Sequence, residues 1–579
     1  MQNIKENEKL NTINHSCAHL LAQAVKQLYP EAKFWVGPVI EEGFYYDIDL
    51  GDQSILEEDL EKIEKEMKKI AKDGKRIVKR ELTKDEALAE FKNDSYKEDL
   101  INQMDDEIIT VYSQGDFSDL CRGPHVETVK ELKNFKLLKV SGAYWKGDAN
   151  NKMLQRVYGI CFPTPEELGE HLALLEEAKK RDHRRLGKEL EIFMISEYAP
   201  GFPFWLPNGM IIKNILEDFW YKEHAKEGYV FVNTPIMLSK ELWEVSGHWT
   251  NYKENMYISE IENKEFAIKP MSCPGAFLIY QNNLHSYKDL PLRMGELGLV
   301  HRHEPSGALA GLFRVRRFVQ DDAHLFMRED QLESEITRFL NFIDRIYHVF
   351  GLSYHVELST RPEDKYIGDL EAWNKSEKIL EESLIKLNRE YKINPGDGAF
   401  YGPKLDFKIK DSLGRQWQCG TLQLDMNMPE RFDLTYIDSD GSKKRPIVFH
   451  HVTYGSLERF IGTLIEHYAG AFPTWLAPVQ VNIIPVNNEY HLEYANEIKD
   501  IFETNNFRVE LDARDEKLGY KIRESQTKKI PYTLVLGDNE KNDQTVTYRI
   551  YGEEGTTTIP INEFVDKIKT SIQNKDLKY

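Results

Sequence analysis

Cysteine is scarce in this chain of 579 residues, and it shows no pairing pattern. The five cysteines are an odd number and lie far apart, at Cys17, Cys121, Cys161, Cys273 and Cys419. Such spacing argues against a disulfide framework and favours a reducing compartment. We therefore expect a cytoplasmic protein whose thiols serve as ligands.

Long apolar segments and a surplus of positive charge are missing as well. No run of about 18 apolar residues could span a membrane, and residues 1–16 lack the apolar core of a signal peptide. We find no internal repeat and no low-complexity segment. The net charge is −20, so any binding of phosphate must depend on local basic patches. The 41% hydrophobic and 30% charged residues are typical of a globular protein. At 579 residues, the chain is long enough for roughly three or four domains.

Residues 301–326, HRHEPSGALAGLFRVRRFVQDDAHLF, combine four arginines, the aromatic pair Phe313 and Phe318, and an acidic, histidine-bearing end. We expect a strand that carries Arg302, a long loop, and a second strand along residues 314–324. Guanidinium groups bind phosphate oxygens in pairs, and an aromatic ring can stack on a base. Asp322 and His324 suit an amine and a metal. The hairpin is therefore predicted to hold a nucleotide and a small amino-bearing molecule; a charged surface hairpin is the alternative.

A second group of reactive side chains lies in the N-terminal part. Residues 11–29 have helical periodicity, which places His15 and His19 on one face. The segment DLCRGPHV adds Asp119, Cys121 and His125. Together these residues indicate a metal-binding or hydrolytic site, although a pair of core histidines would show the same HxxxH pattern.

Capping signals and periodicity predict further elements. We expect a hairpin over residues 36–49, a charged helix over 55–71, and capping boxes at Thr83 and Thr164. The helix that Thr164 opens is predicted to connect two domains. Its basic run, residues 179–185, is either a solvated face or a path for nucleic acid.

A new domain is expected from Lys188 onward. We predict helices over residues 210–226 and 330–350, and strands over 229–237 and 354–360. Residues 396–425 alternate over two strands with a turn at Leu413-Gly414, which is typical of an antiparallel sheet with one face for a ligand. Residues 450–470 predict a strand, a glycine turn and a helix with Arg459 near its start. After a linker, residues 473–478, a β-α-β-α-β-β-α pattern with a basic helix predicts a small domain with a mostly parallel sheet.

These motifs resemble a known family. The 301–326 stretch resembles motif 2 of class II aminoacyl-tRNA synthetases, and GSLERFIG resembles their motif 3. MSCPG, HEPSGAL, RVRRFVQDDAH, FYGPKLDF, QWQCGTLQLD and APVQVNIIP, in this order, resemble the threonyl-tRNA synthetase family from His15 onward. The resemblance implies an α+β multidomain protein with a class II antiparallel-sheet core. The expected parts are an α/β editing domain (1–163), a linker helix (164–187), the catalytic domain (188–472) and an α/β anticodon-binding domain (473–579).

The resemblance implies ATP-dependent activation of L-threonine, transfer to the 3′ end of tRNA(Thr), and hydrolysis of seryl-tRNA(Thr). It also implies Mg²⁺ with ATP, one Zn²⁺ per chain, and a homodimer formed through residues 211–236. Two alternatives remain open: an editing hydrolase without ligase activity, and an RNA-binding regulator that has kept the fold.

Site residues also follow from the resemblance. Cys273, His324 and His450 match the zinc ligands; His451 stands where arginine is usual, and the spacing to Arg459 favours His450 over it. Arg302 and Arg314 match phosphate-binding arginines. Phe318 and Arg459 match the pair that encloses adenine, with Arg459 also near the γ-phosphate, and Glu304 matches the reader of the adenine amino group. Further positions that line the threonine and adenylate site in the family are Gln320, Asp322, Tyr401, Lys404, Gln418 and Ser456.

The editing site is implied in the same way. His15, His19, Cys121 and His125 match the family's HxxxH and CxxxH halves, and Lys97 and Asp119 are candidates for orienting the ester or water; whether a metal binds there is left open. Serine lacks only one methyl group of threonine, and such a group provides roughly 1–3 kcal/mol of discrimination, so a second site is needed.

The chain departs from the family at a few positions. Ala276 and Ala310 stand where histidine is common. The family's N-terminal ubiquitin-like domain is expected to be absent, because the resemblance begins so soon after Met1. No departure removes a core catalytic residue.

Overall fold

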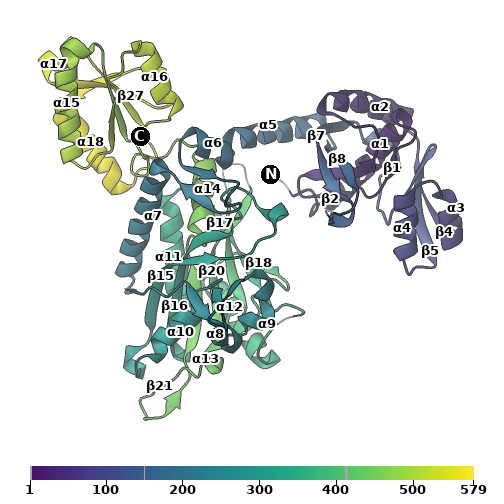
Figure 1. Cartoon of the computed structure of the whole chain (residues 1–579), viewed down its shortest axis with the longest axis horizontal. Helices are drawn as coiled ribbons and strands as arrows, with labels where there is room; N and C mark the ends of the chain where they lie inside the picture. Colours follow the sequence, from purple (N-terminus) through teal and green to yellow (C-terminus); the bar gives the residue numbers. More distant parts are fainter. Residues whose placement is uncertain (1–2, 149, 365, 411–414) are drawn as a thin grey trace. The chain divides into compact units, whose positions relative to one another are not determined.

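The computed structural model describes residues 3–148, 150–364, 366–410 and 415–579. The chain forms two compact units, residues 1–177 and 178–579, and Figure 1 draws their helices and strands and labels many of them. Among the described residues, no helix is both long enough and apolar enough to cross a bilayer.

The first unit is built on an antiparallel sheet with strand order β1-β3-β8-β7 and with β2 paired to β3. The long helix α1 (Glu8–Leu28) and α2 (Leu60–Asp73) share one hydrophobic core with this sheet. The strands are β1 (Lys33–Phe34), β2 (Val39–Ile40), β3 (Gly43–Asp49), β7 (Asn134–Tyr144) and β8 (Met153–Phe162). The predicted hairpin is thus β2–β3. The charged helix begins at Leu60, after one turn of 3-10 helix, and not at residue 55.

A smaller sheet completes this unit. It consists of β4 (Ile77–Thr83), β5 (Ile108–Gln114) and β6 (Phe117–Leu120), accompanied by α3 (Lys84–Glu90) and α4 (Ser95–Gln103). The predicted capping box is present: the Thr83 hydroxyl accepts from the Glu86 N–H at 3.3 Å, and the Thr83 N–H donates to the Glu86 carboxylate at 2.8 Å. Because β6 ends just before Cys121, the second half of the reactive group lies at the edge of this sheet.

The predicted linker helix is wrong in one respect, because it is two helices. The Thr164 capping box opens α5 (Pro165–Arg181). The Asp182 carboxylate then accepts from the Arg184 N–H at 2.8 Å and caps a separate helix, α6 (His183–Glu189). Aspartate is a strong N-cap because its oxygen satisfies an amide that the first helical turn leaves free. This break places His183 at the start of a new helix.

The second unit contains an eight-stranded sheet with order β11-β15-β16-β23-β20-β19-β17-β18. All neighbouring pairs are antiparallel except the two at the edges, β11–β15 and β17–β18. The strands are β11 (Val230–Phe231), β15 (Leu292–His301), β16 (Arg317–Met327), β17 (Ser353–Ser359), β18 (Tyr391–Asn394), β19 (Lys404–Lys410), β20 (Gln416–Asp425) and β23 (Ile447–Val452).

Three amphipathic helices share the core of this sheet: α7 (Pro207–Lys226), α11 (Leu332–Val349) and α14 (Leu457–His467). Their apolar side chains recur at helical spacing, as Leu457, Phe460, Ile461, Leu464 and Ile465 do on α14. The other elements of this part are β9 (Phe193–Ile195), β10 (Pro203–Trp205), β12 (Met237–Ser239), α8 (Lys240–Val245), α9 (His248–Asn251), β13 (Tyr257–Ile261), β14 (Lys264–Ile268), α10 (Cys273–Gln281), α12 (Leu370–Lys386), α13 (Met428–Arg431), β21 (Tyr436–Ile437) and β22 (Lys443–Lys444).

Several predicted boundaries differ from the structure. The strand expected over 229–237 is limited to the two residues of β11 and the start of β12. Arg302 follows β15, and β16 begins only at Arg317, because a tight turn at residues 310–314 occupies the intervening chain: the Phe313 N–H donates to the Ala310 carbonyl at 2.9 Å. The strand predicted from residue 396 begins at Lys404. The turn expected at Leu413-Gly414 lies outside the described residues.

The C-terminal part of the second unit has a five-stranded sheet with order β25-β24-β26-β27-β28. Only the β25–β24 and β24–β26 pairs are parallel, so the prediction of a mostly parallel sheet is wrong. The strands are β24 (Val481–Pro485), β25 (Val509–Leu511), β26 (Tyr532–Leu536), β27 (Thr545–Ile550) and β28 (Thr557–Pro560). The helices are α15 (Asn488–Thr504), α16 (Leu518–Thr527), α17 (Asp538–Asp543), which the sequence pattern missed, and α18 (Ile561–Asn574).

Candidate active site

Cys273, His324 and His450 come together beside the centre of the eight-stranded sheet. His324 on β16 lies directly opposite His450 on β23, and their ring centroids are 4.9 Å apart. Cys273 begins helix α10. One donor atom of each residue lies within 4.8 Å of the others, and all three side chains are buried. The arrangement offers one thiol and two imidazoles around a single point.

These donors fit a zinc ion. Among the described residues, His324 Nε2 is buried without a hydrogen-bond partner. His450 Nε2 lies 2.9 Å from the Asp425 carboxylate, an outer contact that typically orients a ligating imidazole through its other nitrogen. Burial and the nearby carboxylates of Asp322 and Asp425 raise the pKa of the Cys273 thiol. A divalent cation would favour the thiolate, and one sulfur with two nitrogens is a ligand set that zinc prefers.

His451 faces the opposite side of β23, as the alternation of a strand requires. The Tyr229 hydroxyl contacts His451 Nε2 at 2.6 Å, and the His451 ring packs 4.5 Å from the Phe339 ring. This side chain therefore belongs to the helix-covered core and not to the cluster with Cys273.

Three arginines gather near the other end of the same strands. The Arg302 guanidinium lies 5.1 Å above the Phe318 ring. Arg459, in the first turn of α14, donates from Nε to the Phe313 carbonyl at 3.0 Å. Burial lowers the pKa of Arg459, and the positive charges of Arg302 and Arg314 lower it further. Such a concentration of positive charge favours a polyanion.

The structure pairs Arg314 with Glu304: Arg314 Nε lies 2.9 Å from the Glu304 carboxylate. The Glu304 carbonyl also accepts from Arg316 Nε at 2.9 Å. Both predicted residues therefore lie on the loop between β15 and β16, next to each other.

Lys404 and Gln418 are joined by a residue that the sequence analysis missed, Asp406. This fully buried carboxylate accepts from Lys404 Nζ at 2.8 Å and from Gln418 Nε2 at 2.6 Å. It also accepts from the Thr421 hydroxyl at 3.0 Å and the Ser359 hydroxyl at 2.7 Å. The acidic residue inside the alternating run KLDFKIK was the available signal, but only strand pairing shows which side chains it meets.

The remaining predicted residues are Gln320, Ser456, Asp322 and Tyr401. Gln320 pairs with Ser456 across an isolated bridge, and the Ser456 hydroxyl accepts from the Arg459 N–H at 3.3 Å. Burial, with Glu296 and Asp321 nearby, raises the pKa of Asp322 to about 8. Tyr401 lies beside the cluster of Cys273, His324 and His450, with its ring centroid 5.1 Å from that of His450.

In the first unit, the four predicted side chains of the N-terminal group also meet. Cys121 Sγ lies 3.1 Å from His15 Nε2 and 3.1 Å from His125 Nε2. The His19 and His125 ring centroids are 4.3 Å apart. Burial lowers the pKa of His125 to about 2 and raises that of Cys121 to about 12. The His125 imidazole and the Cys121 thiol are therefore neutral near pH 7.

Lys97 and Asp119 form a buried ion pair beside these histidines. His19 Nε2 lies 3.7 Å from the Asp119 carboxylate. Tyr46, which the sequence analysis missed, donates to Asp119 and lies 3.1 Å from Lys97 Nζ. Its position in the alternating run FYYDID predicts an inward side chain but not this contact. A cavity of about 310 Å³ opens onto the group and is lined by residues that include His15, His19 and Cys121.

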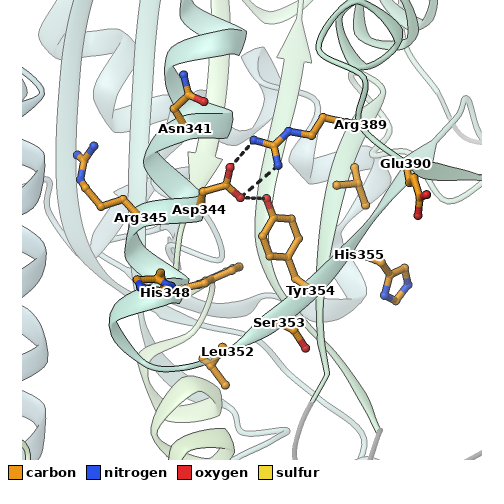
Figure 2. A pocket seen from close by; sticks show the side chains of 12 residues that line it. Asn341, Asp344, Arg345, His348, Leu352, Ser353, Tyr354, His355, Arg389 and Glu390 are labelled. Atoms are coloured by element: carbon orange, nitrogen blue, oxygen red, sulfur yellow. Dashed lines mark hydrogen bonds and ion pairs between the residues drawn. The ribbon is translucent and has the colours of Figure 1, made fainter. Parts of the chain in front are cut away.

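A larger hollow, about 850 Å³, lies between α11 and β17 and contains none of the predicted site residues among those that line it. Figure 2 shows Asp344 accepting from Tyr354 and Arg389 there. The Asp344, Tyr354 and Arg389 side chains thus satisfy one another, whereas His355 Nδ1, also on the lining, is buried without a hydrogen-bond partner among the described residues.

Three segments of the chain match known protein families. Residues 257–468 match the family described as tRNA synthetase class II core domain (G, H, P, S and T). Residues 109–158 match the threonyl and alanyl tRNA synthetase second additional domain, and residues 480–571 match an anticodon binding domain.

A threonine–tRNA ligase of Fusobacterium nucleatum subsp. nucleatum is 57% identical over 558 residues, which are 95% of this chain and 90% of that protein. The chain belongs to the threonine–tRNA ligase family. Another family member, from Clostridium botulinum (strain Hall), is 54% identical over 97% of this chain and 89% of its own length. The crystal structure of the RNA binding domain of threonyl-tRNA synthetase from Cryptosporidium parvum covers 67% of this chain and 98% of its own, with 40% identity and a TM-score of 0.65. The predicted family and fold class are thus confirmed.

Proposed function

We propose that this threonine–tRNA ligase family member activates L-threonine with ATP and transfers it to the 3′ end of tRNA(Thr). One observation carries the proposal: Phe318, Gln320, Asp322 and His324 alternate along β16. Side chains two residues apart share one face of a strand. The nucleotide-binding groups and the metal-binding groups therefore follow one another along a single surface, as a threonyl-adenylate would require.

The ATP site uses charge and position. Arg302 and Arg314 hold the phosphates, while Phe318 and Arg459 enclose the adenine, with Arg459 also near the γ-phosphate. Glu304, released from Arg314, accepts from the adenine amino group. The threonine carboxylate attacks the α-phosphate in line and pyrophosphate leaves, while the arginines neutralise the charge that develops. Mg²⁺, when bound with ATP, would add to this neutralisation. Lys404, Gln418 and Ser456 line the same surface.

Cys273, His324 and His450 would hold one zinc ion per chain. When bound, the ion offers open coordination positions to the amino and hydroxyl groups of threonine. Asp322, Tyr401 and Gln320 line the space around these groups. A site built around a hydroxyl contact rejects valine strongly but cannot exclude serine.

The first unit would hydrolyse seryl-tRNA(Thr), which forms when serine is attached in place of threonine. The neutral imidazoles of His15, His19 and His125 and the thiol of Cys121 surround the cavity that would receive the 3′ end of seryl-tRNA(Thr). The Lys97–Asp119 pair lies next to His19 and would orient the ester or the attacking water. The need for such a second site follows from the single methyl group that separates the two substrates.

Residues of α7 and β11 support a homodimer. Val230 and Phe231 on the edge strand are 50% and 40% exposed, and Met210, Tyr221 and Ile236 nearby are also exposed. An apolar edge strand that pairs on one side only is suited to continuation by a second chain.

The C-terminal part would bind the anticodon. Lys517 and Arg523 of its basic segment are exposed, whereas Lys521 is buried and donates to the Asp512 carbonyl at 3.1 Å.

We also propose the domain limits 1–163, 164–187, 188–472 and 473–579, and a cytoplasmic location, which is supported by five unpaired cysteines.

Threonine-dependent exchange of pyrophosphate into ATP tests the function. Purified protein with Zn²⁺ and Mg²⁺ should catalyse the exchange with threonine and not with valine. Absence of exchange, with hydrolysis of seryl-tRNA intact, would favour the editing hydrolase; absence of both, with tRNA binding intact, would favour the RNA-binding regulator.

A further inference from the structure

His183 lies within the basic run 179–185, but its side chain is buried. It therefore belongs neither to a solvated face nor to a path for nucleic acid. His183 is 3% exposed. Its backbone N–H and its Nδ1 both contact the Glu466 carboxylate, at 3.1 and 2.7 Å. Its Nε2 accepts from the Leu312 N–H at 3.0 Å. Because Nε2 accepts, the proton of a neutral imidazole lies on Nδ1, where it is donated to Glu466. Both ring nitrogens are thus occupied, although Asp182, His183 and Glu466 would otherwise resemble a metal-binding group.

Leu312 belongs to the tight turn of residues 310–314, which precedes Arg314. Gly311 has a φ of +52°, and a Cβ there would lie 2.2 Å from His183 Nε2. The Phe313 ring centroid is 4.1 Å from that of His183 and 4.0 Å from that of Trp417. The turn therefore lies directly against the imidazole, with no space for a side chain at position 311.

Three residues of helix α14 hold the same turn, two directly and one through His183. Arg459, Gly462 and Glu466 follow one another at spacings of three and four residues, so they share one helical face. Arg459 donates to the Phe313 carbonyl at 3.0 Å. A Cβ at Gly462 would lie 3.0 Å from the Phe313 ring. Glu466 contacts the turn only through His183. One end of this helical face thus holds the turn directly, and the other end holds it through the imidazole.

We propose that His183 is a positioning residue for the nucleotide site. It holds the 310–314 turn against α14, so that Arg314 and the Phe313 carbonyl, which fixes Arg459, keep their places. This inference rests on the proposed function for the roles of Arg314 and Arg459. It assigns a part in ATP binding to a residue that lies outside the segment matching the class II core family, residues 257–468.

The test compares three substitutions by the equilibrium binding of a non-hydrolysable ATP analogue. In His183→Gln, the terminal amide reaches as far from the backbone as Nε2 does and can accept from Leu312. In His183→Asn, the shorter amide can reach Glu466 but not Leu312. We expect affinity to fall about tenfold in His183→Ala and in His183→Asn, because a buried amide loses its acceptor, and to fall less than about threefold in His183→Gln. Threonine affinity should stay within about twofold in all three, because the turn contacts only the nucleotide end.

A second buried histidine provides the matched control. His224 is fully buried, and its Nδ1 contacts the Trp220 carbonyl at 2.9 Å, away from the turn. His224→Gln should lower the melting temperature without changing the affinity for the analogue. The inference is overturned if His183→Asn binds the analogue as well as His183→Gln does, or if analogue and threonine affinities fall in parallel. Failure of the proposed function is a separate result, seen as absence of threonine-dependent exchange in the unsubstituted protein, and it leaves the analogue measurement interpretable.

Discussion

Asp406 provides the sharpest single test of the catalytic sheet, because one buried carboxylate holds four side chains. Each of its oxygens has two donors: Gln418 and Thr421 on one, Lys404 and Ser359 on the other. In Asp406→Asn, one oxygen becomes an NH₂ group. The Thr421 and Ser359 hydroxyls can rotate and accept from it, but the Lys404 ammonium cannot.

The magnitude follows from these contacts. A buried donor left without an acceptor costs about 1–3 kcal/mol, and loss of the charge that assists Lys404 adds about 1 kcal/mol. We therefore expect the free energy of unfolding to fall by about 2–4 kcal/mol. Because Lys404 and Gln418 both lose their fixed positions, kcat/KM for threonine-dependent exchange should fall by at least about tenfold.

Ser359→Ala is the matched control. It removes one neutral donor and leaves Asp406 with Lys404, Gln418 and Thr421, so it should cost about 1 kcal/mol of stability and little activity. Denaturant unfolding and the exchange assay measure the two effects. If Asp406→Asn equals Ser359→Ala in both measurements, the reasoning that Asp406 positions Lys404 and Gln418 is refuted.

Four further predictions follow from other contacts. Cys273→Ser should lower bound zinc by about one ion per chain, as measured by atomic absorption, with the circular dichroism spectrum unchanged. His19→Ala should let seryl-tRNA(Thr) persist; an unchanged hydrolysis rate would contradict the editing assignment. Burial raises the pKa of Glu458 to about 7, so its contribution to stability is complete below its unfolded pKa near 4.3 and is lost as the pH rises through about 7. Glu458→Gln, which keeps an acceptor for the Val319 N–H, should remove this loss of up to about 3 kcal/mol in urea unfolding at pH 5 and pH 8. Phe231→Glu should shift the protein to a monomer in sedimentation velocity, because it places a charge in the exposed apolar edge.

Features that depend on neighbours in the chain could be predicted from the sequence. The Thr83 and Thr164 capping boxes, the β2–β3 hairpin and the helix that carries Arg459 near its start all form where their patterns indicate. Each of them is determined by side chains within a few residues of one another, so local spacing is sufficient evidence. The same is true of the motifs that indicated the family.

Boundaries were less predictable where a polar group interrupts a periodic pattern. The run 179–185 looks like one continuous helix, yet Asp182 caps a second helix because its carboxylate competes for the backbone amides. Residues 314–316 alternate as a strand does, yet they lie before β16. The turn at 310–314 already uses the backbone groups of Arg314, and the Arg316 N–H donates to the Gly201 carbonyl.

The sequence by itself determined the family, the kinds of side chain at each site and the local elements that carry them. Only the tertiary structure decided which of two adjacent histidines faces Cys273, because the register between β16 and β23 places His450 opposite His324 and turns His451 away. The same holds for Asp406, for Tyr46, and for His183, which meets Leu312 across 129 residues of chain. Contacts of this kind depend on strand register and on the packing of distant segments, for which a single sequence contains no local signal.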